Sequence, residues 1–285
     1  MSPEVNFARL WSLLNDRPEG RHTAPAETAI GSLYARGDGV EPDPADALRW
    51  FKKAAARGYP PAQQAVGIAL IHGDEAAGEA QDVGAAVTLI TAAAEGGYFL
   101  AQDMLGLMYK KGGPVQQDLS QAWKWYTLAA AQGHAGSQYN LGLLHTNGFL
   151  SNGTSVPQDS VAAAAWYEKA ALQGHAIAQH YLANAYADGK GVAQDHTVAV
   201  KWWTLAAEQG QPHAQYNLGL AYGRGRGVPK ADRNTAIEWL ARAANGKHHF
   251  KPAQKAGRKR EPFLPPEILL EDADGCGSLL PSIYV

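Results

Sequence analysis

Apolar and polar positions along the chain follow a pattern that occurs six times. An aspartate is followed at +4 by alanine, at +7 by a large apolar residue and at +11 and +12 by two alanines, and a glycine then ends the block. The six aspartates are Asp43, Asp82, Asp118, Asp159, Asp195 and Asp232. Offsets of four and seven place residues on one face of a helix. The pattern therefore predicts an amphipathic helix after each aspartate.

A second helix is predicted before each aspartate. There an aliphatic residue is followed directly by glycine or alanine, at +4 by a ring or large apolar residue and at +7 by glycine. The six aliphatic residues are Ile30, Val66, Leu105, Leu141, Leu182 and Leu218. The aspartates suit helix N-caps, and the glycines suit the left-handed position after a helix. Because one helical hairpin cannot bury its own apolar face but a stack can, we expect an all-α solenoid of six helix-turn-helix repeats.

The repeats and their flanks divide the chain into three parts. The six repeats run over residues 25–60, 61–99, 100–135, 136–176, 177–212 and 213–246. Residues 1–24 are expected to form an N-terminal capping helix and a linker, because apolar residues there recur at helical spacing. Residues 247–285 are expected to form a basic capping segment and a tail, since terminal repeats need a cover. The tail either lies along the solenoid, docks on a partner or stays loose.

Two repeats carry extra residues between their helices, over 74–81 and 149–156. Both insertions are expected to project from the same edge of the solenoid. Insertions on one face of a repeat protein often form a binding surface. The alternative is sequence drift in a solvated turn, because a longer loop costs little additional entropy.

The composition of the chain narrows its function class. The net charge is −2 over 285 residues, whereas a dedicated nucleic-acid binder needs a basic excess to replace phosphate counterions. No apolar run approaches the length of a membrane span. The first residues do not resemble a secretory leader, and the single cysteine, Cys276, cannot form an internal disulfide. We therefore expect a cytoplasmic monomer that binds no nucleic acid and does not span a membrane.

A search of the sequence for catalytic chemistry favours structural interpretations. Turns such as Gly189-Lys190-Gly191 follow a helix and recur in several repeats, unlike a phosphate-binding loop, which follows a strand. The ten histidines form no metal-ligand motif; His134 and His175 each follow a closing glycine, so they belong to the repeat. We predict no catalytic residue, no cofactor and no metal.

The best-formed repeat carries a resemblance to a known family. Residues 214–222 (AQYNLGLAY), then 225–228 (GRGV), then Trp239 and the alanine pair after it, resemble the Sel1-like repeat, a relative of the tetratricopeptide repeat. The resemblance implies a right-handed α/α superhelix that serves as an adaptor. Members include signalling scaffolds and immunity proteins against secreted toxins, and the second role stays open here. A cysteine-rich branch proposed to bind β-lactams implies a hydrolase as a further alternative, but this chain lacks its cysteine pairs.

The same resemblance places the first helix of each repeat along a concave groove, where a protein or peptide partner would bind. In repeats 4–6 the residues beside the packed leucines are amides, rings and leucines: Tyr139, Asn140, Leu143, His180, Tyr181, Asn184, Tyr216, Asn217 and Leu220. Such groups bind peptides with modest entropy loss. The alternative is that they only satisfy local helix contacts. A carboxylate clamp of the tetratricopeptide kind would also need a cation, for which Arg224 is the candidate in repeat 6.

Overall fold

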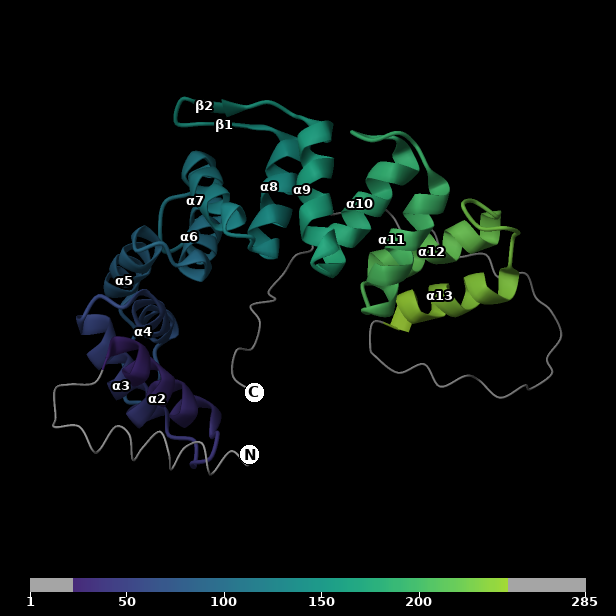
Figure 1. The fold of residues 1–285 in the computed structure, drawn as a ribbon. Helices are drawn as coiled ribbons and strands as arrows, with labels where there is room; N and C mark the ends of the chain where they lie inside the picture. Colours follow the sequence, from purple (N-terminus) through teal and green to yellow (C-terminus); the bar gives the residue numbers. More distant parts are fainter. Residues whose placement is uncertain (1–22, 246–285) are drawn as a thin grey trace. The chain divides into compact units, whose positions relative to one another are not determined.

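The computed structural model describes residues 23–245, and this part of the chain contains twelve helices of 13 residues each (Figure 1). The first helices of the six repeats are α2 (Ala24–Arg36), α4 (Pro60–His72), α6 (Phe99–Lys111), α8 (Ala135–Asn147), α10 (Ala176–Asp188) and α12 (Pro212–Arg224). The second helices are α3 (Pro44–Ala56), α5 (Val83–Glu95), α7 (Leu119–Ala131), α9 (Ser160–Leu172), α11 (His196–Glu208) and α13 (Arg233–Asn245). The predicted N-terminal capping helix and the C-terminal tail lie outside the described residues.

Each helix packs against the next one along the chain, both within a repeat and between repeats. The all-α solenoid of helical hairpins expected from the sequence is therefore confirmed. No helix in the stretch from 23 to 245 is long and apolar enough to cross a membrane.

The aspartates cap the second helices, as predicted. Asp195 Oδ1 accepts hydrogen bonds from the backbone N–H groups of Thr197 and Val198, at 2.8 and 3.0 Å. The equivalent aspartates of the other repeats accept similar bonds: Asp43, Asp82, Asp118, Asp159 and Asp232. Their own backbone N–H groups donate to the first helix, as Asp195 does to the Tyr186 carbonyl at 2.9 Å. Each aspartate thus joins the two helices of its repeat.

The two insertions fold back onto the preceding repeat. Residues 149–156 form an antiparallel hairpin of β1 (Phe149–Ser151) and β2 (Thr154–Val156). Asn152 Nδ2 at its tip donates to Asp118 Oδ2 at 2.6 Å, next to the start of α7. In the loop over 74–81, Glu79 pairs with Lys52 of α3 at 2.5 Å. The expectation of loops projecting from one edge is therefore incomplete, because both insertions also bind the second helix of the repeat before them.

In five repeats the large side chain at +8 from the aspartate faces the glycine of the first helix. The tryptophans at +7 pack as well: Trp50 and Trp125 are buried, and Trp166, Trp202 and Trp239 are partly buried. At +8 Tyr126 is fully buried, and its ring lies 2.8 Å from where a Cβ on Gly106 would be. The six +8 residues are Phe51, Ile90, Tyr126, Tyr167, Trp203 and Leu240.

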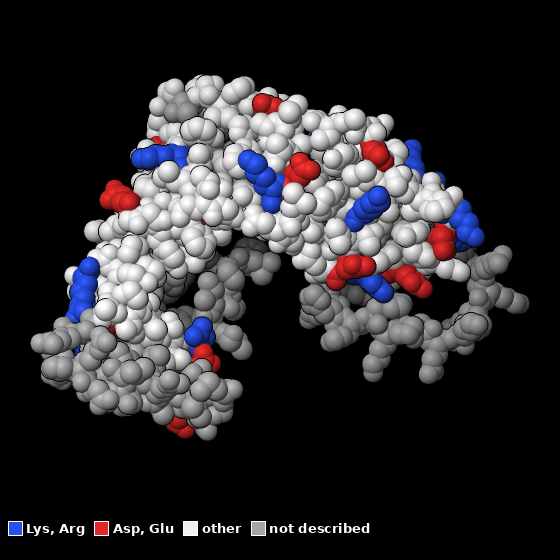
Figure 2. Space-filling model, viewed as in Figure 1, with Lys and Arg blue, Asp and Glu red and all other residues white. Residues whose placement is uncertain are grey.

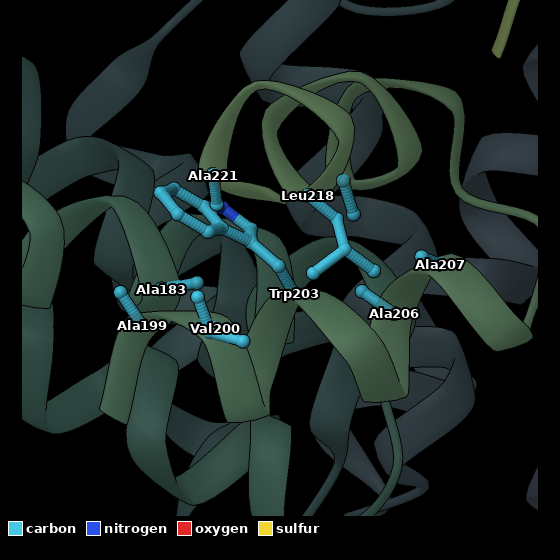
Figure 3. Packing of buried hydrophobic residues seen from close by; sticks show 9 residues of the cluster. Ala183, Ala199, Val200, Trp203, Ala206, Ala207, Leu218 and Ala221 are labelled. Carbon is cyan, nitrogen blue, oxygen red and sulfur yellow. The ribbon is translucent and has the colours of Figure 1, made fainter. Parts of the chain in front are cut away.

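A glycine or alanine of the first helix faces each +8 side chain. In repeat 5 the indole of Trp203 lies close to Ala221 of the next repeat, with Ala183 and Ala199 beside it (Figure 3). The small residue after each packed aliphatic residue therefore makes room for the +8 side chain.

Glutamines link neighbouring repeats in a ladder of hydrogen bonds. Gln179 Nε2 donates to the Ala171 carbonyl of repeat 4 at 3.1 Å, and Gln179 Oε1 accepts from Gln209 Nε2 at 2.8 Å. The same pairing joins Gln102 with Gln132 and Gln138 with Gln173. In repeat 1 an ion pair takes its place, between Arg57 and Glu27.

Candidate partner-binding face

The nine residues predicted for the groove in repeats 4–6 occupy the same three positions of α8, α10 and α12. They lie two and one residues before the packed leucine and two residues after it. Offsets of four residues share a helix face, so the three helices present equivalent positions. We call these nine residues the amide–aromatic face: Tyr139, Asn140, Leu143, His180, Tyr181, Asn184, Tyr216, Asn217 and Leu220.

Four rings meet between α8 and α10. The Tyr139 ring stacks on His175 with centroids 5.1 Å apart and contacts Tyr181 at 5.7 Å. Beneath them lies the +8 residue Tyr167, 5.2 Å from Tyr181. The Tyr167 hydroxyl is 2.8 Å from Thr146 Oγ1, and burial raises the pKa of Tyr167. The aromatic residues of repeats 4 and 5 therefore form one connected surface.

A chain of hydrogen bonds connects α10, α11 and α12. Asn184 Oδ1 accepts from the indole Nε1 of Trp203 and from Asn217 Nδ2, both at 3.0 Å. Asn184 Nδ2 lies 3.0 Å from Nε2 of His180. The predicted residues His180, Asn184 and Asn217 are thus brought together, and Asn184 positions the other two.

His180 is the most buried member of the amide–aromatic face, with 7% of its surface exposed. Burial lowers the pKa of His180 to about 4, with a smaller contribution from the nearby His213. At neutral pH the ring is therefore uncharged. The ring is mostly buried and not open to solvent.

Repeat 3 supplies a cation that the sequence interpretation missed. Lys110 Nζ of α6 donates to Asn140 Oδ1 of α8 at 3.1 Å. The sequence pattern pointed to a cation within repeats 4–6, whereas this contact is made across a repeat boundary. Lys110 occupies in repeat 3 the helix position that Thr146 occupies in repeat 4. A comparison of equivalent positions in neighbouring repeats could have identified it.

The remaining predicted residues are less closely connected. Tyr216 is 45% exposed, and Leu220 is half-buried. Leu143 packs against the core of repeat 4. Arg224 is exposed at the last position of α12, seven residues beyond Asn217.

A serine, a histidine and an aspartate lie together between α6 and α8, but their geometry is not that of a nucleophile. Ser137 is fully buried, and its hydroxyl donates to Asp103 Oδ1 at 2.6 Å. His134 Nδ1 accepts the Ser137 backbone N–H at 3.2 Å and so caps α8. A catalytic serine instead gives its proton to the histidine and reaches the substrate.

The histidines after the closing glycines serve as N-caps. His175 Nδ1 accepts from the Ala178 backbone N–H at 3.1 Å, and Gln211 occupies this position in repeat 6. Within residues 23–245, no group of three or more His, Cys, Asp and Glu side chains is placed to hold a metal ion.

Comparisons with known proteins relate the chain to repeat proteins of bacteria. The structure is similar to the protective antigen c5321 of uropathogenic Escherichia coli, which displays an SLR fold, with 35% identity and a TM-score of 0.69 over 78% of this chain and 46% of that one. It is also similar to a Sel1 repeat protein of Oxalobacter formigenes, with 37% identity and a TM-score of 0.66 over 79% of this chain and 63% of that one. The matched part is less than two thirds of either relative. No curated protein is significantly similar in sequence.

The sequence model of the Sel1 repeat matches five stretches, residues 24–59, 100–134, 135–175, 176–211 and 212–248. The second repeat lies outside these stretches, in keeping with Leu70 and Leu89 at positions where other repeats carry rings. It nevertheless forms the same hairpin, of α4 and α5. Since the matches cover more than half of the sequence, the chain belongs to the Sel1 repeat family.

Proposed function

We propose that this chain is a non-catalytic scaffold that binds a protein or peptide partner through its amide–aromatic face. The observation that carries the proposal is the continuity of this face across repeats. Ring contacts join α8 to α10 through Tyr139 and Tyr181, and a hydrogen bond joins α10 to α12 through Asn184 and Asn217. A partner would thus meet a surface that is already ordered, which lowers the entropy cost of binding.

The side chains of this face suit the recognition of a polypeptide. Tyrosine offers a large, rigid contact area together with a hydroxyl, and asparagine offers both a donor and an acceptor. The Asn217 amide uses one donor on Asn184, which leaves its oxygen for a partner. Tyr216 beside it is exposed.

The experiment is affinity capture of the tagged protein from its native cells, followed by mass spectrometry. It compares the unchanged chain with a triple variant, Tyr139→Ala, Asn140→Ala and Asn217→Ala. The matched control changes three exposed side chains of second helices, Leu128→Ala, Leu205→Ala and Ile237→Ala. Circular dichroism checks that all three proteins keep their helices.

We expect one dominant partner that the control variant retains and the triple variant loses. If that partner is a secreted toxin, the scaffold is an immunity protein. Partners that the triple variant retains would move binding to the insertions or the tail. No captured partner from cells that produce the protein would count against a scaffold.

A further inference from the structure

A buried hydrogen-bond donor lies within the amide–aromatic face. The Nδ1 atom of His180 has no hydrogen-bond partner among the described residues, and the side chain is more than nine-tenths buried. Buried polar groups normally have partners, because an unpaired one has lost its hydrogen bonds to water without replacing them. A buried group of this kind at a recognition surface therefore points to a ligand.

The protonation state of His180 follows from its neighbours. An indole nitrogen can only donate, so the atom of Asn184 that faces Trp203 is the oxygen. The amide group of Asn184 then points to His180 and donates to Nε2. A neutral imidazole that accepts at Nε2 carries its proton on Nδ1. The unpaired atom is thus an N–H donor that needs an acceptor.

The surroundings of His180 favour an uncharged acceptor. Tyr181, Asn184 and His213 contact it, and none of these three carries a fixed charge. The charged residues of α8, α10 and α12 are Asp188 and Arg224, each at the end of its helix. On the face drawn in Figure 2, charged side chains are isolated or mixed in sign. A carboxylate bound at His180 would lose its hydration without gaining a cation as a partner.

The exposed ring of His213 on α12 lies 5.8 Å from the His180 ring, at an angle of 37°. Exposed side chains change rotamer within nanoseconds. His213 can therefore move aside without a change in the helices.

We propose that Nδ1–H of His180 donates a hydrogen bond to a main-chain carbonyl oxygen of the bound partner, which enters between α10 and α12 as His213 swings away. The inference rests on the proposed function and assigns its ligand class, an uncharged stretch of polypeptide. Asn217, held by Asn184 beside this point, supplies a second polar contact to the same stretch.

The test uses the full chain with ¹⁵N-labelled histidine and asparagine side chains, observed by NMR. The probe is N-methylacetamide, a mimic of one peptide unit, and acetate is the matched charged probe. We expect a saturable shift of the His180 Nδ1–H signal and of the Asn217 side-chain amide with N-methylacetamide but not with acetate. The variant His180→Phe should lose the Asn217 shift, and His213→Ala should bind N-methylacetamide at least twofold more tightly.

A His180 proton found on Nε2, a response to acetate alone, or an Asn217 shift that His180→Phe retains would each overturn the proposal. If the folded His180→Phe protein is not obtained, His213→Ala and the two probes still decide the question. A partner that is lost in the triple variant, together with no response to N-methylacetamide, would reject this inference and leave the scaffold in place. A response to the probe without any cellular partner would reject the scaffold instead.

Discussion

At the scale of single residues, the aspartate before each second helix bonds to both helices of its repeat. Its carboxylate caps the second helix, and its backbone N–H binds the first helix of the same repeat. The backbone bond persists in the repeats with insertions, as Asp82 to Leu70 and Asp159 to His145. Short and long loops therefore both bring the aspartate back to the end of the first helix. This explains why insertions are tolerated between the two helices.

The first prediction concerns this cap. Asp195→Ala removes the acceptor of two backbone N–H groups, so it should lower the free energy of unfolding by about 1 kcal/mol. Urea denaturation followed by circular dichroism measures the change. Asp188→Ala, which breaks an exposed ion pair with Lys190, should cost less than about 0.5 kcal/mol. Equal losses in the two variants would argue against a capping role.

The second prediction concerns pH. The pKa of His180 is lowered by burial to about 4, and the pKa of His175 is lowered chiefly by burial. The unfolded chain takes up these protons near pH 6.5 and the folded chain does so only at lower pH, so stability is complete above that value and falls as the pH drops. Between pH 7.5 and 5.5 His180 should cost about 1 kcal/mol of stability, and His175 should add a loss in the same direction.

Denaturation midpoints at several pH values measure this loss. His180→Phe should reduce the pH dependence without abolishing it, because His175 retains its contribution. Leu205→Ala, which removes an exposed side chain of α11 that does not titrate, should leave the dependence unchanged. A His180→Phe protein with the full pH dependence would contradict the assignment.

At the scale of helices, the close approach of each pair depends on a small residue opposite a large one. A Cβ on Gly142 of α8 would clash with the Tyr167 ring. Gly142→Ala should therefore destabilise the protein by about 1–2 kcal/mol, although alanine favours helices. Thermal denaturation measures it. Gly223→Ala in α12, where a Cβ meets nothing closer than 3.6 Å, should instead stabilise by up to about 1 kcal/mol.

Glutamine pairs couple the helices within and between repeats. A double-mutant cycle with Gln179→Ala and Gln209→Ala should give a coupling energy of about 0.5–1 kcal/mol, because the two amides share a hydrogen bond at 2.8 Å. Chemical denaturation of the four proteins measures it. The cycle of Gln179 with Gln194, which bonds elsewhere, should give a coupling near zero. Equal coupling energies in the two cycles would show that the hydrogen bond between Gln179 and Gln209 adds no specific stabilisation.

At the scale of the molecule, each repeat contacts its neighbours along the chain, so stability is a sum of nearest-neighbour terms. Hydrogen exchange can test this, because local opening reports local stability. Gly142→Ala should speed amide exchange in α8, α9 and the adjoining helices and leave α2 and α3 unchanged. Faster exchange throughout residues 23–245 would indicate one cooperative unit instead.

Much of the fold could be predicted because its signals are local. These signals depend on residues that are near in sequence. Examples are the N-cap at Asp195, the left-handed conformation of Gly210 and the residues at +4 and +7 from Leu218. The candidate face could be predicted only as a set of helix positions. Its contacts between Tyr139 and Tyr181, or Lys110 and Asn140, depend on how neighbouring repeats are rotated, which no local spacing specifies.

The sequence by itself determined the number of repeats, the helical hairpin within each and the residues that begin and end its helices. These features could be identified because the same residue types recur at the same spacing in all six repeats. Tertiary packing decided that the +8 side chain, as in Trp203, fills the space between helices, and that His180 lies buried with its Nδ1–H unpaired. The reason is physical: burial and pairing depend on side chains from several helices, whose relative placement is settled only when all of them pack together.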